Sequence, residues 1–196
     1  MSEPLVRGPR ASAWPRWLKQ GPSRMIAPGE IQGWILHEDD RLLAVDKPGD
    51  VVCHPSKHGP MSSLVGAARE HTGLDAVHLV FRLDRETSGV VVLAKDPAMA
   101  RRMQMAMQER RVGKTYLALL TGEFCGEVTV DQPLGDDTSS PVFMKAAVRP
   151  DGRPSVTRFE ALSMGGGFTL ARVTTATGRK HQIRAHAQWL GHSVVG

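Results

Sequence analysis

Four charged side chains lie within five residues, directly before an apolar run that covers 90–94: Arg82, Asp84, Arg85 and Glu86. A buried strand requires only the apolar run, so packing gives no reason for the charges ahead of it. A carboxylate that stays ionised between arginines can attack an electrophile or accept a proton. The segment 81–96 is therefore a candidate catalytic site. A solvated turn is the alternative that its pattern alone leaves open.

Two further basic segments follow along the chain. Residues 110–116, RRVGKTY, bring a run of cations that includes Lys114 up to the only tyrosine, Tyr116. A strand tyrosine is more commonly half-buried packing. Residues 177–184, TGRKHQIR, carry cations into the expected first turn of a helix, where they oppose the helix dipole. Backbone N–H groups together with Arg179, Lys180 and His181 could hold a phosphate there.

The composition is that of an ordinary globular protein. Hydrophobic residues make up 41% of the 196 residues and charged residues 23%, which argues against disorder. The net charge of +5 suits a polyanionic partner such as nucleic acid. Two cysteines make no disulfide framework, and no apolar run approaches the ~20 residues of a membrane span. We therefore expect a cytoplasmic protein without a membrane segment.

The pattern separates an N-terminal arm from a body. Residues 1–29 are basic and rich in proline, so a packed element is not expected there. The arm holds Trp14 and Trp17, which could stack on bases, although docking onto the body is favoured. Residues 30–196 form the expected catalytic body. Nothing in the sequence demands a partner subunit, and a monomer is expected.

The spacing of apolar residues predicts the elements of the body. Expected strands cover 42–45, 90–94, 116–120, 127–130, 156–162 and 168–174. Expected helices begin after Ser62 or Ser63, after Asp96, and at His181. The three glycines at 165–167 predict a hairpin turn, and 131–154 a surface excursion with a short strand at 143–148. These elements predict an α+β fold with a mixed, mainly antiparallel sheet and flanking helices.

Several histidines invite a metal or catalytic interpretation that their spacing does not support. Cys53, His54 and His58 lack a matching second pair of ligands, so no metal site is predicted. His186 and His192 flank the last expected helix, and we expect them to be capping or surface groups.

Four segments in a fixed order resemble the RluA-type family of RNA pseudouridine synthases. They are LLAVDKPGDVVCHP at 42–55, RLDRETSG at 82–89, KTYLALLTG at 114–122 and TGRKHQIRAHAQWLGHSVVG at 177–196. The resemblance covers about 34–196 and implies a pseudouridine-synthase-like catalytic domain. It departs at Phe81, where the family usually has histidine. The family also usually continues past position 196, so the domain is expected to be short at that end.

The resemblance implies that uridine in ribosomal or transfer RNA is isomerised to pseudouridine, without a metal or organic cofactor. It makes Asp84 the catalytic carboxylate, Arg184 its partner and Tyr116 the ring that packs on the base. Arg82 would fill the stack that the flipped nucleotide vacates, and Ile183 would form an apolar wall. The remaining RNA-binding candidates are Arg85, Lys114, Arg179, Lys180 and His181.

Two alternatives of other classes remain open. An RNA-binding or chaperone-like protein on the same fold would share the basic segments but lack catalysis, because of Phe81 and the short end. A carboxylate hydrolase would use Asp84 and Glu86 as acid and base. Neighbours two residues apart in a turn make a poor pair of that kind.

Overall fold

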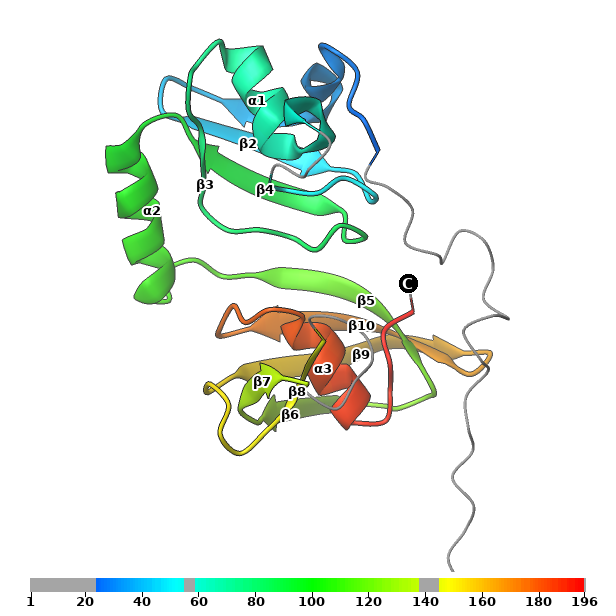
Figure 1. Ribbon diagram of the computed structural model, residues 1–196. Helices are drawn as coiled ribbons and strands as arrows, with labels where there is room; N and C mark the ends of the chain where they lie inside the picture. Colours follow the sequence, from blue (N-terminus) through cyan, green and yellow to red (C-terminus); the bar gives the residue numbers. More distant parts are fainter. Residues whose placement is uncertain (1–23, 55–58, 138–144, 196) are drawn as a thin grey trace, which may run out of the picture. The chain divides into compact units, whose positions relative to one another are not determined.

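The computed structural model describes residues 24–54, 59–137 and 145–195, so Trp14, Trp17 and His58 lie outside the described residues. The chain divides into two compact units, the first up to Arg101 and the second from Arg102 to Val195 (Figure 1). The boundary falls inside helix α2, Pro97–Gln108. No helix in the described part of the chain has both the length and the apolar composition to cross a membrane.

The first unit is built on a four-stranded antiparallel sheet in the order β1-β2-β4-β3. Its strands are β1 Ile35–Glu38, β2 Leu42–Lys47, β3 His78–Leu79 and β4 Gly89–Ala94. The two long strands pair over their whole length, from Leu42 opposite Ala94 to Lys47 opposite Gly89. The end of β2 therefore lies beside the start of β4, directly after the charged segment.

Helix α1, Leu64–Thr72, packs on this sheet with two short 3-10 helices, η3 Glu30–Trp34 and η4 Pro60–Ser62. The helix begins as predicted, because the Ser63 hydroxyl accepts a hydrogen bond from the Gly66 N–H at 3.1 Å. It ends at Gly73 with φ 66°. Ile26 is buried in the same core although it falls within the predicted arm.

Helix α2 also begins where the sequence predicts. The Asp96 carboxylate accepts a hydrogen bond from the Met99 N–H at 2.8 Å, as an N-cap does. Arg41, which is ion-paired with Asp96, is the main cause of the lowered pKa of that carboxyl. Met99 and Met103 are half-buried and Ala106 is buried, so these positions share the less exposed face of the helix.

The second unit has its own four-stranded antiparallel sheet, in the order β5-β10-β9-β6. Its strands are β5 Thr115–Thr121, β6 Glu127–Asp131, β9 Val156–Gly165 and β10 Phe168–Thr175. The turn between β9 and β10 has φ 62° at Gly166 and 81° at Gly167, which confirms the predicted glycine hairpin. Helix α3, Gln182–Trp189, covers one face of this sheet (Figure 1).

Two short strands within the expected surface excursion at 131–154 are packed instead. Strands β7 Leu134–Asp136 and β8 Ala146–Val148 pair with each other. Leu134 and Ala146 are buried against Ala185 of α3, and this apolar contact holds the pair on the helix. The strand predicted over 143–148 therefore begins at Ala146, and residues 143–144 lie outside the described part.

The architecture is α+β, as predicted. Every pair of named strands in the described residues is antiparallel, which agrees with the predicted mainly antiparallel sheet. A parallel contact occurs as an isolated bridge between Val52 and Ser63.

Candidate functional site

The charged segment forms a loop over 80–88 that joins β3 to β4. The Thr87 N–H donates a hydrogen bond to the Asp84 carbonyl at 3.2 Å, which closes a turn after the candidate carboxylate. Gly89 then enters β4 with φ 118°, a conformation that a side chain would strain. Asp84 is half-buried and Arg82 is exposed. The loop thus carries the carboxylate at the margin of the first unit's core.

Lys47 lies under this loop and is completely buried. Its ammonium donates hydrogen bonds to the carbonyl oxygens of Pro48 at 2.8 Å and Val51 at 2.8 Å, both in its own turn. It also donates to the Arg85 carbonyl at 3.1 Å, which lies one residue beyond Asp84. A buried ammonium must satisfy its donors, and one of its acceptors here belongs to the candidate loop.

Cys53 contacts the same loop at Leu83, the residue that precedes Asp84. It is buried, and its thiol donates to the Leu83 carbonyl at a sulfur-to-oxygen distance of 3.5 Å. Lys47 and Cys53 therefore anchor the two residues that flank the candidate carboxylate.

The electrostatics of this support follow from burial. Loss of solvation lowers the pKa of the Lys47 ammonium, and nearby acidic groups that include Asp84 act in the opposite direction. Burial raises the pKa of the Cys53 thiol. Lys47 therefore brings an ammonium, and Cys53 a neutral thiol, to the backbone carbonyls on either side of Asp84.

The two arginines of the loop differ in burial, because Arg82 is exposed and Arg85 is half-buried. The Nε of Arg85 donates to Glu86 at 2.6 Å, so these two charges of the opening segment pair with each other.

In the second unit, Tyr116 lies on β5 opposite Val173 of β10. Tyr116 and Ile183 of α3 are half-buried and pack on one apolar cluster, which also contains Leu120 and Phe159. The tyrosine and the isoleucine that the sequence singled out therefore share one core.

Lys114 joins the start of β5 to the turn ahead of α3. Its ammonium donates to the Thr177 carbonyl at 3.0 Å, and burial lowers its pKa. The ammonium sits so close that a Cβ at Gly178 would lie 3.1 Å from it. Lys114 is thus half-buried and engaged with the main chain of the second basic segment.

The second basic segment forms a turn over 177–181 and then enters α3. His181 has φ 50°, in the left-handed region. Arg179 donates through Nε to the Pro154 carbonyl at 3.3 Å, and Lys180 lies 3.9 Å from the Asp136 carboxylate. Arg184 is half-buried one turn into the helix. The expected phosphate cradle has one of its backbone donors already engaged, because the Arg179 N–H donates to the Gln182 side chain at 2.9 Å.

Three polar residues of the second unit form a network that the sequence did not predict. Gln182, Thr157 and His186 are buried and hydrogen-bonded to one another in series. The expectation that His186 is a capping or surface group was wrong, because its ring has no exposed surface. His192 is half-buried, and its Nδ1 lies 2.8 Å from the Thr121 carbonyl. The available signal for this network was the spacing of Gln182 and His186, four residues apart on the helix face that also carries Ala185.

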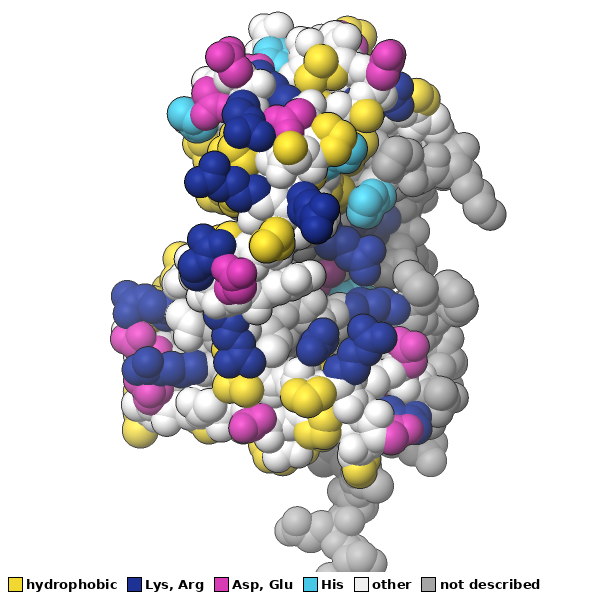
Figure 2. All heavy atoms as spheres, turned by 90° about the vertical axis from the view of Figure 1, so that its left-hand side faces the viewer, with side chains coloured by type: hydrophobic (Ala, Val, Ile, Leu, Met, Phe, Trp, Pro, Cys, Tyr) yellow, Lys and Arg dark blue, Asp and Glu magenta, His cyan; other side chains and the backbone are white. Residues whose placement is uncertain are grey.

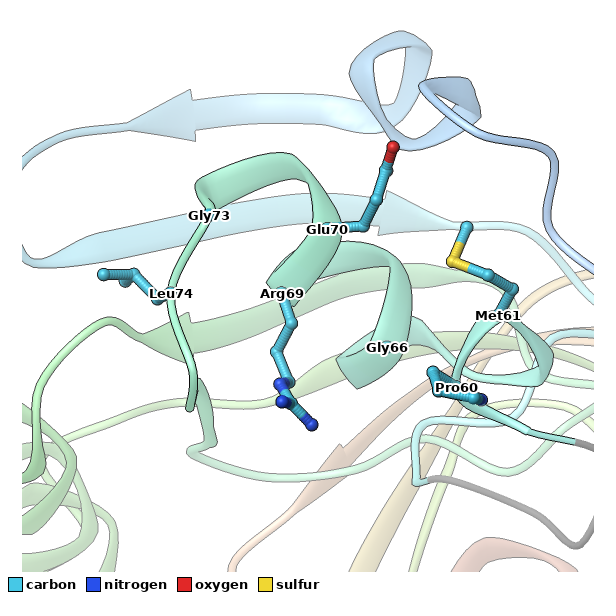
Figure 3. Close-up of a pocket in the computed structure, with 7 residues that line it drawn as sticks. All are labelled: Pro60, Met61, Gly66, Arg69, Glu70, Gly73 and Leu74. Atoms are coloured by element: carbon cyan, nitrogen blue, oxygen red, sulfur yellow. The ribbon is translucent and has the colours of Figure 1, made fainter.

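A pocket of about 350 Å³ opens beside α1 (Figure 3). None of the predicted site residues lines it. Its lining residues are Pro60, Met61, Gly66, Arg69, Glu70, Gly73 and Leu74.

Basic side chains occur on both units. On the face that Figure 2 shows, Lys and Arg side chains are spread over each unit with acidic side chains among them. Among the residues that the structure describes, no three His, Cys, Asp or Glu side chains converge as a metal site would require. Asp84 belongs to the first unit, whereas Tyr116 and Arg184 belong to the second.

Comparisons of the sequence with known proteins point in one direction. A family model described as RNA pseudouridylate synthase matches residues 41–189. Ribosomal large subunit pseudouridine synthase C of Vibrio vulnificus is 36% identical over 170 residues, covering 85% of this chain and 52% of that protein. Ribosomal large subunit pseudouridine synthase D of Vibrio parahaemolyticus is 33% identical over 166 residues, covering 83% and 50%. The chain spans about half the length of these curated relatives.

Solved structures give a similar result. Human RNA pseudouridylate synthase domain containing 1 is similar with a TM-score of 0.71 and 27% identity, covering 87% of this chain and 70% of that chain. Human RNA pseudouridylate synthase domain containing 4 has a TM-score of 0.68 and 27% identity, covering 85% and 68%.

Proposed function

The chain belongs to the RluA-type family of RNA pseudouridine synthases, and we propose that it converts uridine to pseudouridine in structured RNA. The reaction breaks the bond between C1′ of the ribose and N1 of uracil. The base turns, C1′ bonds to C5, and the hydrogen lost from C5 is replaced by one on N1. Atoms and charge balance without an oxidant or a cofactor.

The observation that carries the proposal is the position of Asp84 on a loop whose main chain is held on both sides. Leu83 and Arg85 are anchored by Cys53 and Lys47, so the carboxylate is presented from a defined backbone. A carboxylate in a fixed position can act as nucleophile or as proton acceptor in the rearrangement. Asp84 is the proposed catalytic residue.

Other residues take roles by their match to the family's motifs. Arg184 matches the arginine of the family's closing motif and is the proposed partner of the catalytic carboxylate. Tyr116 and Ile183 bound the pocket for the base, and their packing on one apolar cluster supports this assignment. The target nucleotide must leave its stack to react, at a cost of a few kcal/mol, and Arg82 fills the space that it vacates.

The RNA backbone is held by the proposed contacts of basic residues. These are Arg85, Lys114, Arg179, Lys180 and His181. The net charge of +5 supports binding of a polyanion, which displaces counterions and weakens as salt rises. The names of the curated relatives favour ribosomal RNA over transfer RNA. We further propose that the protein acts in the cytoplasm as a monomer, without a metal.

The test is pseudouridine formation on unmodified large-subunit ribosomal RNA transcribed in vitro. Wild-type protein and Asp84→Asn are incubated with this RNA, and pseudouridine is mapped by carbodiimide labelling and primer extension. The substitution keeps the shape of the side chain but removes its charge. We expect site-specific pseudouridine with wild-type protein, none with the variant, and RNA affinities that differ little.

Outcomes of this experiment separate the alternatives. Salt-sensitive RNA binding by wild-type protein, with no pseudouridine on ribosomal or transfer RNA, would favour the RNA-binding alternative, in which Phe81 accompanies lost catalysis. Equal activity of wild-type protein and Asp84→Asn would remove Asp84 from the reaction.

A further inference from the structure

A series of hydrogen bonds through three buried side chains runs through the second unit, from β9 to the turn ahead of α3. The Gln182 amide donates to the Thr157 hydroxyl at 3.0 Å and to the Val156 carbonyl at 3.0 Å. Its carbonyl oxygen accepts from the Thr177 hydroxyl at 2.8 Å and from the Arg179 N–H at 2.9 Å. The side chain thus bonds on one side to β9 and on the other to the turn 177–181.

The chain continues from Thr157 to His186. The Thr157 hydroxyl lies 2.8 Å from Nδ1 of His186, and Nε2 of the same ring lies 3.0 Å from the Gln132 carbonyl. Thr157 and His186 have no exposed surface, and Gln182 is 4% exposed. Solvent therefore offers no substitute partner for any of the three side chains.

The partners fix the direction of every bond in this chain. The Gln132 carbonyl only accepts, so Nε2 carries the hydrogen, and Nδ1 of a neutral ring accepts from Thr157. The Thr157 oxygen can then accept from the Gln182 amide, whose oxygen faces the Arg179 N–H. One neutral tautomer of His186 satisfies all of these groups at once. Burial, which lowers the pKa of His186, favours the same neutral form.

The turn that Gln182 holds is not one that its residues favour. His181 adopts φ 50°, a left-handed conformation that is uncommon for a residue with a side chain. Such a conformation persists when the surroundings over-determine it. Gln182 supplies that constraint directly after His181, while Ile183 and Arg184 follow at once in the first turn of α3.

We propose that Gln182 is a positioning residue, which acts through Thr157 and His186 to fix the turn 177–181 and hence the direction in which α3 presents Arg184. This inference rests on the proposed function for its catalytic consequence. Its structural part, the fixed turn, stands on the hydrogen bonds alone. A small displacement of a positioned group can reduce the rate of chemistry by up to about 100-fold.

The test compares substitutions that remove and keep the hydroxyl in the middle of the chain. Thr157→Val removes the hydroxyl at nearly constant shape, and Thr157→Ser keeps it. Gln182→Met removes the amide, and Thr129→Val on the exposed face of β6 is the matched control. Two quantities are measured at a temperature where all variants are folded. They are the single-turnover rate at saturating in vitro transcribed large-subunit ribosomal RNA and the hydrogen exchange of the Arg179 amide.

We expect Thr157→Val and Gln182→Met to lower the rate between about 10-fold and 100-fold and to lose protection of the Arg179 amide. Thr157→Ser and Thr129→Val retain both. If these hydrogen bonds serve stability alone, Thr157→Val and Gln182→Met will lower the melting temperature and leave the single-turnover rate unchanged. That result would overturn the inference. Retained protection of the amide in Gln182→Met would also overturn it.

The two proposals fail in different ways. If wild-type protein forms no pseudouridine, the proposed function fails, and the amide exchange still decides whether Gln182 fixes the turn. If wild-type protein is active and Thr157→Val matches it, the inference fails and the proposed function stands.

Discussion

The Lys47 ammonium donates a hydrogen bond of 3.1 Å to the carbonyl oxygen of Arg85, the residue that directly follows Asp84. The two residues are 38 positions apart in the sequence, and the bond joins the end of β2 to the candidate loop. Because Lys47 is wholly buried, this contact depends on folding of the first unit and cannot be replaced by water.

Replacement of Lys47 by methionine should therefore affect both stability and activity. The carbonyls of Pro48, Val51 and Arg85 would lose a buried donor, which we expect to cost about 1–3 kcal/mol of unfolding free energy. Urea unfolding and the pseudouridine assay measure the two effects. The matched control is Arg102→Met, which removes an exposed cation and should change stability by less than about 0.5 kcal/mol. Wild-type values for Lys47→Met would contradict the proposed support.

The two cysteines should differ sharply in reactivity. Cys53 is buried with a raised pKa, whereas Cys125 is exposed. The thiolate is the reactive form, so burial slows alkylation of Cys53 both sterically and through ionisation. Iodoacetamide at pH 8 followed by mass spectrometry should label Cys125 first, and Cys53 after unfolding in urea. Comparable rates in the folded protein would mean that the Leu83 contact opens freely.

Gly66 should not tolerate even a methyl group. A Cβ there would lie 1.8 Å from the Pro60 carbonyl oxygen, a clash between two backbone segments. Alanine would otherwise favour the helix by about 1 kcal/mol, so the expected loss of about 1–3 kcal/mol runs against helix propensity. Gly33→Ala is the matched control, because nothing lies within 4 Å of its added Cβ. Thermal unfolding of both variants provides the comparison, and equal melting temperatures would contradict the close approach.

Acidification should destabilise the second unit through His186. Burial lowers its pKa below 6.5, so the unfolded chain binds a proton more readily than the folded protein does. The stability is therefore present above about pH 6.5 and is lost as pH falls through the lowered pKa. Urea midpoints between pH 7.5 and pH 5 should fall more steeply for wild-type protein than for His186→Gln. Parallel slopes would show that the pKa of His186 does not differ between the folded and unfolded states.

Local sequence patterns predicted the elements whose signals are themselves local. The run at 90–94 became β4, Asp96 caps α2, and the glycines at 165–167 form a hairpin. Each of these depends on neighbours within a few residues, such as a side-chain oxygen three residues ahead of an N–H. The charged segment lies directly before β4, where the apolar run at 90–94 placed it.

Contacts between distant segments could not be predicted in the same way. A lysine after an apolar strand is ordinarily solvated, and nothing near Lys47 in the sequence indicates that its acceptor is the Arg85 carbonyl. His186 was expected at the surface because its partners are distant in the sequence: Thr157 lies on β9 and Gln132 directly follows β6. The packing of β7 and β8 on α3 was missed for a similar reason, since polar residues surround the few apolar ones that make the contact.

The buried position of Thr157 also affects the register in which β9 pairs with its neighbours during folding. Thr157 pairs with Thr175 of β10 and with Val130 of β6, while its neighbour Arg158 faces solvent and pairs with Glu127. A slip of one residue would turn Arg158 into the apolar interior and point the threonine outward, away from His186. A misaligned β9 would thus bury the guanidinium of Arg158 without a partner and leave the His186 ring without the Thr157 donor. The hydrogen-bonded threonine therefore adds to the apolar pattern in selecting the native register of β9.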